Sequence, residues 1–153
     1  IRYGVMLEVP SLAEQLDGLA PKISFLSIGT NDLTQFLFAA DRANPKLAER
    51  YDWISPSILR FLRRVLTSLE GHAVDVTVCG EMGGRQLEAL ALIGLGIRRL
   101  SITPAAVGPI KELVCKIDAA EIGEAMAGWL AKPPPDLRAA LIDWANARNI
   151  SLD

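Results

Sequence analysis

Three apolar runs in this chain each finish on a polar side chain that could take part in chemistry. Glu8 ends the first run, Asn31 and Asp32 follow the second, and Cys79 ends the third. Carboxylates bind hard cations, backbone N–H groups at a helix start hold phosphate, and a thiol acts as a nucleophile or a proton donor. Because the carboxyl ends of parallel strands open around one crevice, these residues are predicted to meet in an active site.

Glu8 and Asp32 follow consecutive predicted strands. Neighbouring strands lie about 4.8 Å apart, so the two carboxylates could share one Mg²⁺, which accepts one or two carboxylates and leaves its other positions to water and phosphate. The alternative for Glu8 is a polar strand end with no further role. For Asn31 or Asp32 the alternative is a cap on a helix that begins near Leu33. The residues by themselves leave these alternatives open.

Gly29 and Arg42 add features that suit an anionic substrate. Gly29 precedes Asn31 and Asp32 and permits close backbone approach, so a phosphate could meet main-chain N–H groups there. The guanidinium of Arg42 suits bidentate binding of phosphate or carboxylate, although it could equally form a surface salt bridge. Together with the thiol of Cys79, these groups indicate a small phosphorylated acid as substrate.

The remaining reactive side chains indicate no second site. His72, the single histidine, follows a helix and is predicted at the amino-terminal end of the sheet, so a Cys79–His72 pair is not expected. Cys115 lies in an amphipathic pattern and is predicted to be buried or half-buried. Three arginines on the polar face of a predicted helix are expected to be solvated rather than to bind phosphate; they are Arg60, Arg63 and Arg64.

Composition excludes several classes of protein. The chain has 153 residues, half of them hydrophobic, with a formal net charge of −2, which fits one globular domain and gives no basic field for nucleic acid. No apolar stretch approaches the roughly 20 residues of a membrane helix, and the start lacks the features of a signal peptide. We therefore expect a cytoplasmic protein that neither inserts into membranes nor binds nucleic acid. Because the chain begins without Met, inside an apolar run, it is expected to be a fragment of a longer protein.

Strand and helix patterns alternate along the chain. Four buried strands are predicted, at Tyr3–Val9, Ile23–Ile28, Val74–Val78 and Ile97–Ile102. Helices are predicted at Ser11–Leu19, Leu33–Ala40, Ser55–Leu69, Arg85–Leu95, Val107–Ile117, Ala119–Ala131 and Leu137–Ala147. Four β/α units without a hairpin indicate a parallel sheet. The pattern leaves open a small doubly wound sheet and half of a (β/α)₈ barrel, since a complete barrel takes about 250 residues.

Four motifs resemble one known family. They are Gly4–Pro10, Ser27–Gln35, Asp41–Asn44 and Cys79–Gly84, and they are similar to the phosphoenolpyruvate-binding domain of enzyme I of the bacterial phosphotransferase system. The motif of residues 27–35 is shared with the wider family, which includes pyruvate phosphate dikinase and phosphoenolpyruvate synthase. Residues 41–44 resemble enzyme I more than they resemble those relatives. Other segments of the sequence resemble the nitrogen-related paralogue of enzyme I.

The resemblance implies roles for individual residues. Glu8 and Asp32 would bind Mg²⁺, while Asn31, Asp32 and Arg42 would hold phosphoenolpyruvate. Cys79 would protonate the methylene carbon of the enolate to give pyruvate. A carbon acid of this kind needs no histidine, in agreement with the predicted distance of His72 from the thiol.

The resemblance also implies a fold and partners. Residues 1–153 would form the C-terminal half of a (β/α)₈ TIM barrel, with strands five to eight in four β/α units. The phosphoryl group would pass to a histidine of an upstream domain and then to a phosphocarrier protein, so the fragment alone is expected to be inactive. A homodimer is implied as well. The alternatives are a dikinase or synthase on the same scaffold, and a module that mainly dimerises.

Overall fold

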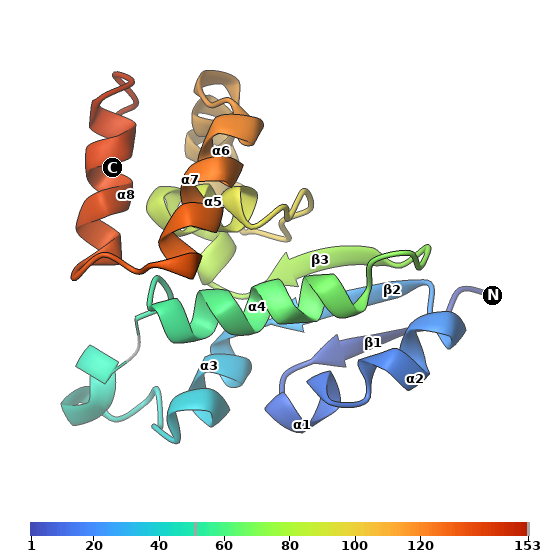
Figure 1. Cartoon of the computed structure of the whole chain (residues 1–153). Coiled ribbons are helices and arrows are strands. Elements are labelled where there is room, and N and C mark those ends of the chain that lie inside the picture. Colours follow the sequence, from blue (N-terminus) through green and yellow to red (C-terminus); the bar gives the residue numbers. More distant parts are fainter. Residues whose placement is uncertain (51, 153) are drawn as a thin grey trace.

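The structure is a computed structural model that describes residues 1–50 and 52–152. Its strands are β1 (Gly4–Leu7), β2 (Phe25–Gly29) and β3 (Asp75–Cys79). Its helices are α1 (Pro10–Ala13), α2 (Leu16–Leu19), α3 (Thr30–Phe38), α4 (Pro56–Ser68), α5 (Gln86–Gly94), α6 (Pro104–Lys116), α7 (Ala119–Ala131) and α8 (Leu137–Asn146). Short 3₁₀ helices occur at Ala20–Lys22, Pro45–Arg50 and Met82–Gly84. Figure 1 shows this α/β arrangement, with the sheet beside α4 and α6 to α8 grouped beyond the carboxyl end of β3.

The three strands form one parallel sheet in the order β1-β2-β3. The register pairs Leu7 with Ile28 and Gly29 with Cys79. Strands that run in the same direction bring their carboxyl ends to one edge (Figure 1), so the polar residues after β1, β2 and β3 share that edge.

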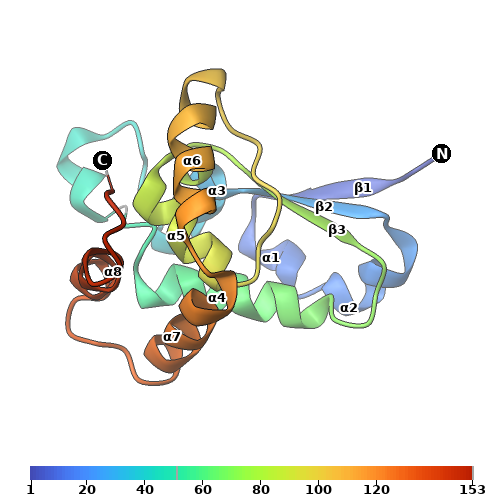
Figure 2. The same cartoon turned by 90° about the horizontal axis from the view of Figure 1, so that it is seen from above.

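Helices cover one face of this sheet. Leu7, Leu26 and Ile28 are fully buried, and α1, α2 and α4 lie together on one side of the strands in Figure 2. Because successive strand residues point to opposite faces, Met6 and Phe25 belong to the other face, where they are 50% and 39% exposed. The same open face carries the last residue of β2 and of β3.

The sequence predicts a fourth strand at Ile97–Ile102, and this prediction is wrong within the described residues. The segment forms a single parallel bridge between Leu100 and Val78, supported by two backbone hydrogen bonds of 3.0 and 2.8 Å. The chain turns after Cys79 at Gly80, whose φ is 97°, and this turn leaves the segment without a continuing partner.

Two helix predictions also need correction. The helix predicted over Ser11–Leu19 is two short helices, because Gln15 leaves the helical conformation at φ −107° and ψ 0°. Helix α3 begins at Thr30 rather than near Leu33, with Gly29 as its N-cap residue and no side-chain cap. The alternative that Asn31 or Asp32 caps this helix is therefore wrong, since both lie within its first turn.

Helix α4 agrees with its sequence pattern. Ser55 accepts a hydrogen bond from Ile58 N and Pro56 occupies the first turn, as an N-cap serine and an N1 proline do. The three arginines of its polar face are exposed, as predicted, and each also contacts a neighbouring group. Arg60 donates to Leu130 O at 2.9 and 2.7 Å, and Arg63 donates to Leu95 O at 3.2 Å. These guanidinium groups satisfy carbonyls at the ends of α7 and α5.

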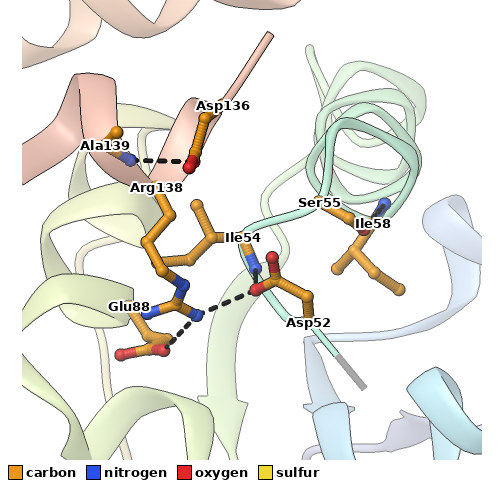
Figure 3. Close-up of polar contacts among 8 residues, drawn as sticks. All are labelled: Asp52, Ile54, Ser55, Ile58, Glu88, Asp136, Arg138 and Ala139. Carbon is orange, nitrogen blue, oxygen red and sulfur yellow. Dashed lines mark hydrogen bonds and ion pairs between the residues drawn. The ribbon is translucent and has the colours of Figure 1, made fainter. Parts of the chain in front are cut away.

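A charged cluster connects the C-terminal helix to the rest of the molecule (Figure 3). Arg138 of α8 donates to Asp52 Oδ1 at 2.8 Å and to Glu88 Oε1 at 3.0 Å, and only 4% of the Glu88 side chain is exposed. Burial by itself lowers the pKa of Arg138, but its hydrogen bonds to the two carboxylates outweigh burial and raise that pKa. The ion pair gives the buried Glu88 side chain a partner of opposite charge.

Candidate active site

The sheet register places the first candidate residues in one row. Gly29 pairs with Cys79, and Glu8 follows Leu7, the partner of Ile28. A Cβ atom on Gly29 would lie 2.7 Å from Glu8 Cγ and 2.9 Å from Glu8 Oε1. The Glu8 side chain therefore lies over the end of β2, in space that is open because residue 29 has no side chain.

Asp32 and Arg42 lie together on the next part of the chain. Asp32 is in the first turn of α3, and Arg42 Nη2 lies 3.8 Å from its Oδ1, with both side chains partly exposed. The backbone N–H of Arg42 donates to Gln35 Oε1 at 3.3 Å, which holds the segment after α3 against that helix. The ion pair matches the surface-salt-bridge alternative, and the same geometry leaves the guanidinium accessible to an anion at the start of α3.

Cys79 is partly buried at the end of β3 and contacts β2. Ser27 Oγ donates to Cys79 Sγ at 3.4 Å, and Sγ donates to Ile28 O at 3.4 Å. Thr30 Oγ1 donates to Cys79 O at 2.9 Å. The thiol is thus held at the edge of the sheet, on the open face that also carries Gly29.

Asn31 is joined to the loop after β3. Glu81 N donates to Asn31 Oδ1 at 3.1 Å, and Asn31 Nδ2 donates to Glu81 Oε1 at 3.4 Å. Gly80 lies between Cys79 and Glu81 in the chain, and a Cβ at this glycine would lie 2.7 Å from Thr30 Oγ1. The loop and the first turn of α3 therefore form one unit. Sequence reasoning did not assign Ser27, Thr30 or Glu81; the signal for Ser27 is a hydroxyl inside an otherwise apolar strand.

The start of α3 is suited to an anion. Its nine residues are capped by a glycine without a side-chain hydrogen bond, so the N–H groups of the first turn have no side-chain cap. A helix N-terminus of this kind attracts phosphate through its free N–H groups and the helix dipole. Asn31 and Arg42 flank it with further donors.

The acids available for a metal ion are few. Among residues 1–50 and 52–152, no group of three or more His, Cys, Asp or Glu side chains is arranged to hold a metal. A structural zinc site, which needs four such ligands, is not supported in that part of the chain. Two carboxylates remain as hard oxygen donors: Glu8, which lies beside Gly29, and Asp32, in the first turn of α3. Mg²⁺ binds one or two protein carboxylates together with water and phosphate oxygens.

The other reactive residues lie elsewhere. His72 is exposed before the amino-terminal end of β3, as predicted. Cys115 is exposed on α6, so the prediction of a buried or half-buried residue is wrong; its neighbour Val114 is also half exposed. The buried stripe of α6 uses Ile110 and Leu113 instead, and position 115 lies off that stripe.

Two further charged features lie away from the carboxyl ends of the strands. At the amino-terminal edge, hydrogen bonds from Arg99 and then Arg2 lower the pKa of Asp75. A cavity of about 550 Å³ lies beside the Arg138 cluster and is lined in part by Arg85, Glu88 and Arg138. None of Glu8, Asn31, Asp32, Arg42 and Cys79 lines this cavity, so the candidate chemistry lies on the open edge of the sheet.

Comparison with known proteins gives a consistent picture. Residues 1–119 match the family described as "PEP-utilising enzyme, PEP-binding domain". The chain is 45% identical over 124 residues to phosphoenolpyruvate-protein phosphotransferase of Borreliella burgdorferi, covering 81% of this chain and 22% of that protein. It is 45% identical over 120 residues to a protein of Escherichia coli named phosphoenolpyruvate-dependent phosphotransferase system, covering 78% of this chain and 16% of that protein. Multiphosphoryl transfer protein 1 of Escherichia coli is 37% identical over 118 residues, 77% of this chain and 14% of that protein.

The match is thus to one part of much longer relatives, since the chain spans about a fifth or less of their length. None of the helices in the described residues has the length and apolarity needed to cross a lipid bilayer.

Proposed function

Because this chain belongs to the family of PEP-utilising enzymes, with their PEP-binding domain over residues 1–119, we propose that it binds phosphoenolpyruvate for a phosphoenolpyruvate-protein phosphotransferase. The relatives that are 45% identical carry phosphotransferase names, which favours this reaction over a dikinase or synthase. The observation that carries the proposal is the shared edge of the sheet, where Glu8, the start of α3 and Cys79 lie together.

Binding of the substrate follows from the charges at this edge. Phosphoenolpyruvate carries a phosphate and a carboxylate, and the N–H groups at the start of α3 together with Asn31 provide donors for the phosphate. Arg42 lies within reach of the same turn, through its contact with Asp32, and its planar guanidinium suits either anion. Glu8 and Asp32 would hold Mg²⁺, which when bound would neutralise charge on the phosphoryl group.

The thiol of Cys79 would complete the reaction. When the phosphoryl group leaves the enol oxygen, the P–O bond breaks and a P–N bond forms to a histidine, and an enolate remains. Cys79 then gives its proton to the methylene carbon: the S–H bond breaks, a C–H bond forms, and sulfur keeps the electron pair. The product is pyruvate.

The same proposal includes the rest of the protein. A sheet covered by helices on one face, with the site on its open face, is what the C-terminal half of a (β/α)₈ barrel would present. We infer that residues 1–153 form that half, that the accepting histidine lies in an upstream domain, and that a phosphocarrier protein receives the phosphate. A cytoplasmic homodimer belongs to the same set of predictions.

The test uses the intact protein that contains this chain. Cys79→Ala should abolish pyruvate formation from phosphoenolpyruvate and should leave the dissociation constant for the substrate with Mg²⁺ within about twofold, because the thiol donates a proton and does not hold phosphate. Cys115→Ala is the matched control, since that thiol is exposed on α6, and it should turn over normally. Normal turnover by Cys79→Ala would remove the thiol from the mechanism, and a requirement for ATP would favour a dikinase or synthase.

A further inference from the structure

Three hydrogen bonds attach Cys79 to the end of β2 and the first residue of α3. Ser27 Oγ lies 3.4 Å from Sγ, Sγ lies 3.4 Å from Ile28 O, and Thr30 Oγ1 lies 2.9 Å from Cys79 O. Gly29 is the register partner of Cys79 in the sheet, and the three contacts come from residues on either side of Gly29 in the chain. They fix the sulfur and the backbone of one residue from a single neighbouring segment.

Thr30 fixes the backbone. Its side chain is 1% exposed, and a buried hydroxyl needs a hydrogen-bond partner, which it finds in the carbonyl of Cys79. The next residue, Gly80, has φ 97°, and a Cβ there would lie 2.7 Å from Thr30 Oγ1. The hydroxyl of Thr30 thus holds the Cys79 carbonyl and packs against the turn directly after the thiol.

Ser27 fixes the sulfur. It lies two residues before Gly29 and therefore on the open face of the sheet, where Cys79 also lies. Serine is not a residue that favours a strand for its packing, and the hydrogen bond described for this hydroxyl goes to the sulfur. The polar residue inside an apolar strand is explained by its contact with the thiol.

We propose that Ser27 and Thr30 are positioning residues that aim the thiol of Cys79 at the reacting carbon. This inference rests on the proposed function, in which Cys79 is the proton donor. Proton transfer needs a defined donor position, and a misplacement of about 1 Å can lower a rate about 100-fold. After the proton has left, the Ser27 hydroxyl still donates to the sulfur, and a hydrogen bond to a charged acceptor is stronger than one to a neutral acceptor.

The experiment measures pyruvate formation by the intact protein in two matched pairs of variants. Ser27→Ala is paired with Thr77→Val, because Thr77 is the register partner of Ser27 on the same face and no hydrogen bond from its hydroxyl to the thiol is described. Thr30→Val is paired with Thr30→Ser, which keeps the hydroxyl. Ser27→Ala and Thr30→Val should lower kcat about 10- to 100-fold with KM for phosphoenolpyruvate within about twofold.

A second measurement separates positioning from packing. When proton transfer is slowed, the solvent deuterium isotope effect on kcat should rise in Ser27→Ala and Thr30→Val, whereas Thr77→Val and Thr30→Ser should keep the wild-type value and wild-type kcat within about threefold. Thr30→Val could fail to fold because it leaves the partly buried carbonyl of Cys79 without the hydroxyl that donates to it. Ser27→Ala, with its partly exposed site, keeps the proposal testable in that case.

The possible outcomes are distinct. Wild-type kcat in Ser27→Ala and Thr30→Val, with no turnover in Cys79→Ala, would overturn the positioning inference and leave the proposed function standing. An equal loss of kcat in Thr30→Ser and Thr30→Val would overturn it too, because the retained hydroxyl would then make no difference. An equal loss of kcat in Thr77→Val and Ser27→Ala would do the same, because the contact of Ser27 with the thiol would then have no special effect. Undiminished turnover in Cys79→Ala would defeat the proposed function itself.

Discussion

Substitution of Gly29 by alanine tests whether the position of the Glu8 carboxylate matters. The added Cβ would lie 2.7 Å from Glu8 Cγ and 2.9 Å from Oε1, whereas ordinary contacts begin at 3.4 Å. The carboxylate must therefore move by roughly half an ångström or more. The φ of Gly29 is −84°, outside the left-handed region that favours glycine, so alanine at this position requires no left-handed backbone.

The expected loss follows from the geometry of the ion. Mg²⁺ requires oxygens at 2.0–2.1 Å in near-ideal octahedral positions, so a displaced carboxylate no longer binds it directly. We expect Gly29→Ala to weaken Mg²⁺ binding about 10- to 100-fold, which is about 1.4–2.8 kcal/mol. The unfolding temperature should change little, since the buried face of the sheet is untouched.

The assay is a calorimetric titration of Mg²⁺ in the presence of phosphoenolpyruvate, with the unfolding temperature measured on the same sample. Gly18→Ala is the control, because nothing lies within 4 Å of a Cβ at that position. Glu8→Gln should reproduce the loss, and the double variant Glu8→Gln with Gly29→Ala should add little to it. Wild-type Mg²⁺ affinity in a folded Gly29→Ala protein would refute the reasoning.

Two further predictions concern stability. Arg138→Met should lower the free energy of unfolding, measured in urea, by about 2–4 kcal/mol, because it leaves the buried carboxylate of Glu88 without its cation. The Arg138 side chain is 40% exposed, so this loss is smaller than that expected for a wholly buried pair. Arg64→Met, at an exposed ion pair, should cost less than about 1 kcal/mol, and equal losses would contradict the argument. For Asp75, the hydrogen bond from Arg99 lowers the folded-state pKa, so its stabilisation is present above the unfolded pKa and disappears as the pH falls through the folded one. Asp75→Asn should therefore be less stable than wild type near pH 7 and equal to it in strong acid, and a difference that persists in strong acid would refute this assignment.

Most of the local structure could be predicted from the sequence. The helix over Ala119–Ala131 has its predicted bounds, and α4 begins with its N-cap serine and N1 proline as expected, because caps and apolar periodicity act over a few residues. The predictions that fail depend on distant partners. The strand predicted at Ile97–Ile102 has only one bridging residue, Leu100, whose partner is Val78 of β3.

The candidate site shows the same division. The residue types at the strand ends could be predicted, since an acid, an amide and a thiol each follow an apolar run. Contacts such as Thr30 with the Cys79 carbonyl, or Asn31 with Glu81, could not, because they join residues about 50 positions apart. Their existence depends on the register between β2 and β3.

The sequence by itself determined which chemical groups stand at the carboxyl ends of the strands, because strand periodicity and polar endings are local properties of the chain. The tertiary structure alone decided how those groups face one another. The sheet register places Gly29 beside Cys79, and the missing side chain at Gly29 gives the Glu8 carboxylate its position. Pairing between strands is a non-local interaction, so no single segment of the sequence contains it.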